Sequence, residues 1–185
     1  YPNISYPNKV LIKGDQYVSV RLNGQNLQGN NLQQKVAITN FLGQVKVAQG
    51  YVAISRGQYW RLTGQYDPVL GLGSPYYLGC DQNGSTVDFG YSAGQFGIHV
   101  TNEWLNEGTN KVQVNNVATD FEIDHMEIAD GGFAGLMIKY DNNGNHRMDN
   151  VEIHHLYIHD IGSEGMYIGS TQGEPQHLFE DLHIH

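Results

Sequence analysis

The chain has 185 residues, of which 39% are hydrophobic and 16% are charged, and its formal net charge at pH 7 is −9. This length suits one cored domain, and because no apolar run reaches the roughly 18 residues that a membrane helix needs, we expect no membrane span. The negative charge disfavours nucleic acid as a partner, since binding to phosphates relies on clustered Lys and Arg residues.

Composition favours strands over helices. The 23 Gly and 12 Tyr residues are typical of short strands joined by tight turns, so the expected class is all-β. The single Cys80 excludes an intrachain disulfide framework, and we interpret it as a small buried hydrophobic residue. Residues 119–185 hold thirteen Asp and Glu, only two Lys and Arg, and eight of the nine His residues. We therefore expect the chemistry of the protein in this acidic part.

The first predicted strands are short and irregularly spaced. Each combines alternating apolar residues with a polar or glycine end, and they cover residues 16–22, 35–40 and 58–64. Residues 64–118 contain many turn-forming residues, so we predict a loop-rich excursion from the main body there.

An internal repeat lies in the acidic part of the chain. Residues 121–130, FEIDHMEIAD, match residues 151–160, VEIHHLYIHD, at an offset of 30, and the match continues from 132–138 to 162–168. A third copy is predicted at 179–185, at an offset of 26 from the second. The clearest predicted coils are 119–148, 149–176 and an incomplete 177–185.

The apolar positions of the repeat predict stacked parallel strands. Ile123, Met126 and Ile128 alternate with polar residues except at one two-residue corner, which is the periodicity of a strand. The Leu-x-x-Leu-x-Leu-x-x-Asn frame of leucine-rich repeats is absent, whereas Gly135 and Gly165 suit sharp turns between faces. We therefore predict an all-β right-handed parallel β-helix, a single-stranded solenoid.

The predicted strand at the end of the chain stops before its turn. A solenoid with an uncovered last coil exposes strand edges and an apolar cross-section, which favours association. We therefore expect the single unit of residues 1–185 to be the N-terminal portion of a longer solenoid. Further coils or a partner chain would cover the end at His185.

Three segments carry a family resemblance that together spans most of the chain. They are Gly14-x-x-Tyr17-x-x-Val20-x-Leu22-x-Gly24, Val36-x-Ile38-x-Asn40-x-x-Gly43-Gln44-Val45 and Ile153-His154-x-x-Tyr157-Ile158-His159-Asp160-x-Gly162-x-Glu164-Gly165-x-Tyr167-Ile168-Gly169. They resemble secreted right-handed β-helix proteins of Bacteroidetes-type bacteria, with a pectate-lyase-like architecture. The resemblance implies a secreted or cell-surface location, with export machinery such as type IX secretion as a partner. It indicates architecture more than activity, because this fold hosts lyases, hydrolases, epimerases and plain stalks.

Side chains that alternate away from the apolar positions form a predicted outer face. At a strand spacing of ~4.8 Å they give two columns, which are Glu127, Tyr157, His183 and Ala129, His159, His185. Such a face suits a polysaccharide groove, in which Tyr157 or Tyr167 stacks on a sugar. His159 or Asp160 would then move a proton. The further predicted substrate contacts are Lys139, His183 and His185. The alternative is a solvated polar ladder, since outward strand positions must be polar in any case.

Two carboxylates are candidates for a hydrolase acid and base. Asp160 and Glu164 would need to lie about 5 Å or about 6.5–9.5 Å apart. Asp130 repeats Asp160 one copy earlier, so both can instead be turn-formers that bond to local backbone. Glu164 lies opposite Ala134 and is not repeated, which makes it the stronger candidate.

A lyase is a further alternative. Lys139, Arg147 and the nearby imidazoles are similar to the basic side chains with which β-helix lyases abstract a proton beside a uronate carboxylate. Because the acidic part holds two cations among thirteen acids, an anionic uronate would need calcium as a bridge.

Two kinds of metal site are compatible with the sequence. The loop 141–149 offers oxygen donors at alternate positions, and its predicted calcium ligands are Asp141, Asn143, Asn145 and Asp149. The loop departs from the EF-hand pattern, and its alternative interpretation is an Asn/Gly-rich turn. The imidazoles His154-His155, His159 and His183-x-His185 could bind a transition metal, but they lack the spacing of known structural sites.

The functional expectation is a secreted or cell-surface protein that binds or processes polysaccharide, with the type of reaction left open. One alternative is a non-catalytic adhesin or stalk. Another is a fragment of a larger exported protein whose active site lies beyond His185.

Overall fold

The computed structural model describes residues 9–13, 20–23, 28–41, 45–47, 51–64, 96–101, 110–115, 118–139, 147–169 and 178–185. Within these residues the regular elements are strands, and no helix there is long and apolar enough to cross a membrane. The strands are β1 (Lys9–Lys13), β2 (Val20–Asn23), β3 (Val36–Phe41), β4 (Val45–Val47), β5 (Val52–Ser55), β6 (Gln58–Thr63), β7 (Ile98–Val100), β8 (Val112–Asn115), β9 (Thr119–Ala129), β10 (Ala134–Lys139), β11 (Arg147–His159), β12 (Glu164–Ile168) and β13 (Leu178–Ile184).

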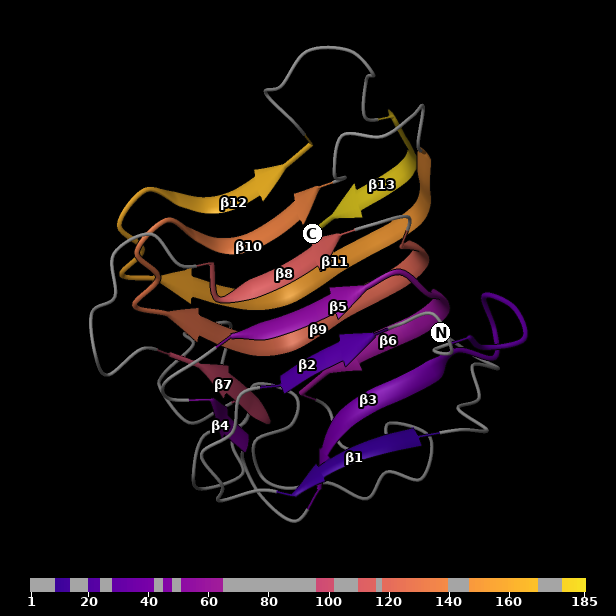
Figure 1. Cartoon of the computed structure of the whole chain (residues 1–185), viewed down its shortest axis with the longest axis horizontal. Helices are drawn as coiled ribbons and strands as arrows, with labels where there is room; N and C mark the ends of the chain where they lie inside the picture. Colours follow the sequence, from indigo (N-terminus) through magenta and orange to yellow (C-terminus); the bar gives the residue numbers. More distant parts are fainter. Residues whose placement is uncertain are drawn as a thin grey trace.

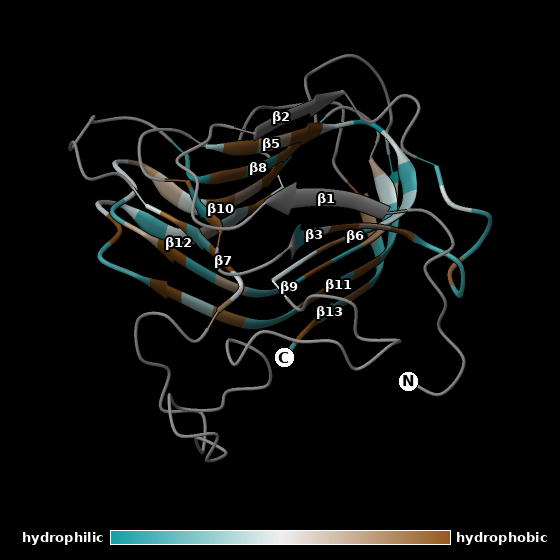
Figure 2. Ribbon diagram, turned by 90° about the horizontal axis from the view of Figure 1, so that it is seen from below, coloured by the Kyte–Doolittle hydropathy of each residue, from teal (hydrophilic) through white to brown (hydrophobic). Residues whose placement is uncertain are grey.

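The strands form two sheets, in which every pair of neighbouring strands is parallel. The larger sheet has the order β1-β3-β6-β9-β11-β13, with β4 and β7 alongside, and the smaller has the order β12-β10-β8-β5-β2. In the later coils each passage of the chain adds one strand to each sheet, so that β9 and β10 are followed by β11 and β12 (Figure 1). Figure 2 shows the two sheets facing each other around a shared interior. The class is therefore all-β, and the parallel stacking is compatible with a parallel β-solenoid.

The predicted register between the two clearest copies is confirmed. Strand β11 pairs with β9 at the offset of 30, so that Ile153 lies beside Ile123 and Ile158 beside Ile128. Ile123, Ile128 and Ile153 are fully buried, as predicted, whereas Ile158 is only partly buried against the core.

Single residues in the left-handed region bend the long strands at fixed places. His125 and His155 (φ 51° and 49°) form the predicted corner that interrupts the apolar alternation. A second column of bends lies nearer the strand starts, where the Asn150 side-chain amide donates to Asp120 Oδ1 at 2.6 Å. Asn, Asp and His tolerate positive φ better than most residues, which explains polar residues at the corners. The three columns are Asp120, Asn150, Asp181; His125, His155; and Asp130, Asp160.

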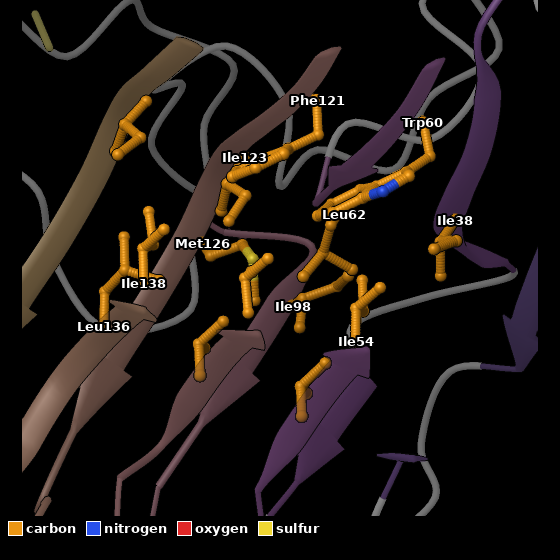
Figure 3. Packing of buried hydrophobic residues seen from close by; sticks show 14 of the residues in the cluster. Ile38, Ile54, Trp60, Leu62, Ile98, Phe121, Ile123, Met126, Leu136 and Ile138 are labelled. Carbon is orange, nitrogen blue, oxygen red and sulfur yellow. The ribbon is translucent and has the colours of Figure 1, made fainter. Parts of the chain in front are cut away.

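The core consists of apolar side chains from both sheets. Ile38, Leu62 and Ile123 of the larger sheet are fully buried, and Ile54 and Leu136 come from the smaller one (Figure 3). The largest members, Trp60 and Phe121, stack in register across β6 and β9, with ring centroids 4.6 Å apart and planes 4° apart. Burial of this area supplies the main driving force for the stacking of the coils.

Two strands lie inside the segment predicted as an excursion. Strand β7 pairs with β9, where Ile98 lies beside Met126, and β8 pairs with β5 and β10. The prediction for 64–118 was therefore too broad, because short apolar alternations at 98–100 and 112–115 are part of the sheets. Residues 65–95, 102–109 and 116–117, which also belong to that prediction, lie outside the described residues.

The predicted alignment of the third copy is wrong. Strand β13 pairs with β11 at an offset of 31, so that Leu182 lies beside Val151 and His183 beside Glu152. The expected offset of 26 would have placed His183 beside Tyr157. His183 and His185 therefore do not extend the predicted columns of Tyr157 and His159.

Candidate functional site

The outer face of β9 carries carboxylates that water does not reach. Phe121 and Ile123 belong to the core, so alternation along the strand sends Glu122 and Asp124 to the opposite face. These two side chains and Glu127 have exposed fractions of 1%, 0% and 1%, respectively. A buried charge without a partner is costly, so the neighbours of these carboxylates define the candidate site.

A buried charged cluster, consisting of Lys35, Arg61, Glu122 and Asp124, holds two of these carboxylates. The Lys35 ammonium donates to Glu122 Oε2 at 2.7 Å, and Arg61 Nε lies 3.1 Å from Glu122 Oε1. Arg61 also donates two hydrogen bonds to Asp124, from Nε to Oδ2 at 2.5 Å and from Nη2 to Oδ1 at 2.8 Å. The Thr63 hydroxyl donates to Asp124 Oδ1 at 2.6 Å. Parallel register creates these contacts, since Arg61 and Thr63 pair with the two acidic residues across β6 and β9.

The two carboxylates of this cluster are kept ionised. Burial by itself would raise the pKa of Asp124, but the Arg61 charge and the hydrogen bond from His125 hold that pKa well below its ordinary value. Burial would also raise the pKa of Glu122, and the hydrogen bond from His154 and two neighbouring cations hold it below its ordinary value. At neutral pH two cations therefore balance two anions in the cluster.

An imidazole cluster, consisting of His125, His154 and His155, lies against these carboxylates. His125 Nδ1 contacts Asp124 Oδ1, and His154 Nε2 lies 3.0 Å from Glu122 Oε1. On the other side of its ring, His154 Nδ1 lies 2.7 Å from His155 Nδ1. The rings of His125 and His155 are stacked, with centroids 4.8 Å apart and planes 4° apart.

The imidazoles of this cluster differ in proton affinity. Burial lowers the pKa of His154, but the hydrogen bond to Glu122 and the charges of Asp124 and Glu122 together outweigh burial and leave that pKa above its ordinary value. Burial and the charges of His125 and His154 lower the pKa of His155. His154 therefore takes up a proton before His155 does.

A relay cluster, consisting of Glu127, Tyr157, His159 and Asp160, lies farther along β9 and β11. His159 bridges two carboxylates, with Nε2 3.1 Å from Glu127 Oε1 and Nδ1 2.7 Å from Asp160 Oδ2. The Tyr157 ring lies over the His159 ring, with centroids 4.2 Å apart. The Asp160 side chain is 75% exposed and that of Glu127 only 1%, so the bridge runs from the surface to a buried acid.

The environment of Glu127 favours a proton on one imidazole over another. Burial lowers the pKa of His159, but the hydrogen bonds to Asp160 and Glu127 outweigh it and raise that pKa above its ordinary value. His99 on β7 lies 3.8 Å from Glu127, and its burial lowers its pKa despite the attraction of the acid. His159 therefore takes up a proton before His99 does.

The structure brings together three of the predicted catalytic residues, and the fourth lies on the other sheet. Tyr157, His159 and Asp160 belong to the relay cluster. Glu164 lies on β12 of the other sheet, and no hydrogen bond joins it to Asp160. The Glu164 Oε2 atom is buried without a hydrogen-bond partner among the described residues. Asp130 and Asp160 both have positive φ, which agrees with the predicted role of turn-formers at repeated corners.

The predicted substrate-binding residues are dispersed over the two sheets. Tyr167 and Lys139 lie on β12 and β10, and Tyr167 contacts the ring of Phe133 at a centroid distance of 5.8 Å. His183 and His185 lie at the end of the larger sheet, in the corrected register. His185 stacks on the ring of His154 with centroids 5.0 Å apart, and so borders the imidazole cluster.

Most of the predicted calcium loop lies outside the described residues, namely Asp141, Asn143 and Asn145. The remaining predicted ligand, Asp149, accepts a hydrogen bond from Arg147 Nε at 2.5 Å. Arg147 also pairs with Glu180 on the neighbouring strand.

Sequence reasoning missed the partners from earlier coils. Lys35, Arg61 and His99 are far from the repeat in sequence, and only the register across the interrupted coil brings them to Glu122 and Glu127. The sequence does contain one signal of these partners. Three acidic residues, Glu122, Asp124 and Glu127, occupy outward positions of β9, and so many carboxylates on one strand indicate that cations lie nearby. No family model, curated protein or solved structure matches this chain.

Proposed function

We propose that this protein is a secreted or cell-surface right-handed β-helix, of the kind that Bacteroidetes-type bacteria export, which binds or processes polysaccharide at the relay cluster. The hand follows from the general rule that connections between parallel strands of one sheet are right-handed in about 98% of cases. The location and the source follow from the sequence resemblance.

The observation that carries the proposal is the Tyr157 ring beside an imidazole that bridges two carboxylates. The partly exposed Tyr157 ring, which also stacks on the ring of Phe96 at a centroid distance of 6.3 Å, offers an apolar surface that a sugar can contact. His159 can exchange protons near neutral pH, and a general acid or base needs a group of that kind within hydrogen-bond reach of the substrate. Binding and proton transfer are thus available within one cluster.

Glu127 and Asp160, the two carboxylates of the relay cluster, differ in the role that they can take. Glu127 is buried and holds the His159 ring from behind, so we assign it a positioning role. Asp160 is exposed, so a substrate hydroxyl can displace it from Nδ1 of His159. In this scheme His159 moves the proton and Tyr157 orients the sugar.

A non-catalytic surface protein is the second candidate. The carboxylates of both clusters are paired within the chain, and a polar ladder that stabilises stacked coils needs nothing more. This alternative predicts that no polysaccharide is turned over, whether or not one is bound.

The test is a screen of the full chain against a panel of neutral and uronate polysaccharides. Released reducing ends report hydrolysis, and the absorbance of unsaturated uronates reports elimination. We expect Tyr157→Ala to weaken binding and His159→Gln to abolish turnover while binding remains.

The matched control is Tyr167→Ala, which removes the same ring from the other sheet and should change neither readout. Binding without turnover would favour the non-catalytic candidate. The absence of both activities, or an equal loss in the Tyr167 variant, would contradict the assignment to the relay cluster.

A further inference from the structure

The imidazole cluster has converging nitrogen donors that the proposed polysaccharide chemistry does not use. One ring nitrogen from each of His125, His154 and His155 lies within 4.8 Å of the others. His125 comes from β9, and the other two come from β11 one coil later, at the corner where both strands bend. The parallel register at an offset of 30 stacks His155 on His125 and so produces the convergence.

The carboxylates bonded to two of the rings leave one nitrogen of each ring for a metal. Asp124 accepts the hydrogen bond of His125 Nδ1, and Glu122 accepts that of His154 Nε2. A carboxylate in this position fixes the tautomer and orientation of an imidazole, and it is the usual second partner of a metal-binding histidine. The opposite nitrogens, Nε2 of His125 and Nδ1 of His154, are then the available donors.

The spacing of the nitrogens suits a small ion after a modest adjustment. His154 Nδ1 and His155 Nδ1 face each other at 2.7 Å. Two nitrogens on one tetrahedral zinc ion, each bound at ~2.0–2.1 Å, lie roughly 3.3 Å apart. A small rotation of His155, which is only partly buried, is therefore enough to replace the contact between the rings by two bonds to a metal.

The donor set determines the class of ion. Glu122 and Asp124 are already engaged by Lys35 and Arg61, which leaves imidazole nitrogens as the ligands. Imidazole suits zinc, copper and nickel, whereas calcium and magnesium take oxygen ligands. Three protein ligands leave a further coordination position for water or another group.

We infer that His125, His154 and His155 form a binding site for a divalent transition metal, with zinc as the first candidate, and that Asp124 and Glu122 orient two of the ligands. This set differs from the one expected from sequence, since it includes His125 and omits His159, His183 and His185. The site is separate from the relay cluster, and it stands whether or not the polysaccharide proposal holds.

The test is a calorimetric titration of the metal-free full chain with Zn²⁺ in an excess of Ca²⁺. Visible absorption of bound Co²⁺ then reports tetrahedral nitrogen coordination. We expect one tight equivalent of Zn²⁺ in the wild type. The variants His125→Asn and His155→Asn should bind it about 100-fold more weakly or worse, since loss of a partner behind a ligand alone costs roughly 10–100-fold.

These variants preserve the backbone, because both histidines have positive φ and Asn tolerates that conformation. The control His183→Asn removes an exposed imidazole outside the cluster and should leave the affinity unchanged. Thermal unfolding of each variant checks the fold, and if His125→Asn does not fold, the less buried His155→Asn decides the result. The inference is overturned if the wild type binds no stoichiometric Zn²⁺, if the folded cluster variants keep its affinity, or if His183→Asn loses as much.

Discussion

At the scale of single residues, the outer face of β9 depends on Arg61. This one guanidinium contacts both Glu122 and Asp124, and both carboxylates are buried. A buried ion pair adds little net stability compared with an apolar replacement of the whole set, but removal of one partner leaves an uncompensated charge. The cost of losing Arg61 should therefore be much larger than the strength of an ordinary ion pair.

We predict that Arg61→Met lowers the free energy of unfolding by about 3–5 kcal/mol, measured by urea denaturation at neutral pH. The control is Arg147→Met, because Arg147 also pairs with two acids but its side chain is 54% exposed. Exposed pairs contribute about 0–1 kcal/mol, so the control should stay within that range. Equal losses in the two variants would mean that Glu122 and Asp124 are not held as buried ions.

His159 makes stability depend on pH. Its pKa in the folded protein lies above the ordinary value of 6.5 because of its bonds to Asp160 and Glu127, although burial opposes the shift. A raised pKa means that the folded state binds the proton more tightly than the unfolded state does. The stabilisation is therefore fully present below about pH 6.5 and is lost as the pH rises through the raised pKa.

We predict that His159→Gln lowers the melting temperature at about pH 5.5 and has a smaller effect at about pH 8.5. Thermal unfolding followed by circular dichroism over this range gives the difference between wild type and variant. Groups such as His154 titrate in both proteins and cancel in that difference. A difference that stays constant with pH, or grows towards high pH, would contradict the assigned proton on His159.

At the scale of elements, the sequence predicts the strands better than it predicts their neighbours. The gapless offset of 30 identified the pairing of β9 with β11, because apolar positions and corners repeat together. The third copy was misaligned because one coil contains the same apolar spacing twice, in residues 148–153 and 153–158. Residues 179–184 match both, and the apolar pattern alone does not choose between them.

The corner residue could have resolved that ambiguity. Asp181 has positive φ and lies in the column of Asn150, where short polar side chains tolerate the left-handed region. The corner of the other candidate alignment is occupied by His155 instead.

For the candidate site, Tyr157, His159 and Asp160 were predictable because they are close together in sequence. Arg61 was not, because it lies outside the repeat, 63 residues before Asp124 in the sequence.

Gly135 and Gly165 occupy the same place in the two copies of the repeat but are not equivalent. Neither has the positive φ that a glycine turn would show. A Cβ atom at Gly135 would lie 2.7 Å from the Gly165 carbonyl oxygen and 2.7 Å from Ile158 Cγ2. At Gly165 the nearest atom would be 3.8 Å away. Gly135 therefore permits close contact between β10 and β12, rather than the sharp turn expected from sequence.

We predict that Gly135→Ala lowers the free energy of unfolding by about 1–3 kcal/mol, because the backbone oxygen cannot move aside without shifting β12. Gly165→Ala is the matched control, and it should be neutral or stabilise by up to about 1 kcal/mol through a less flexible unfolded chain. Chemical denaturation of both variants gives the comparison. Equal effects would show that the two coils are not packed as closely as the structure indicates.

At the scale of the whole molecule, β13 is an edge strand among the residues that the structure describes. This strand is the last in its sheet, and its Leu178 and Ile184 side chains are 53% and 51% exposed. The position beside Ile184 one coil earlier, Ile153, is fully buried, whereas Leu178 lies beside the exposed Arg147. An edge strand with unpaired backbone groups and apolar side chains is a template for pairing with another chain.

We predict that the chain of residues 1–185 associates through this edge, because pairing would cover both the backbone groups of β13 and its exposed apolar side chains. Light scattering after size exclusion should show a concentration-dependent increase in mass, and Ile184→Lys should suppress it, since a charged side chain on an edge opposes pairing. Gln33→Lys adds the same charge at an exposed position outside β13 and should leave association unchanged. Hydrogen exchange adds a local measurement, in which amides of 178–184 should be less protected than those of 151–158 in the dilute protein and gain protection on association. A protein that stays monomeric at high concentration, with equal protection from hydrogen exchange in both segments, would show that the edge of β13 does not mediate association.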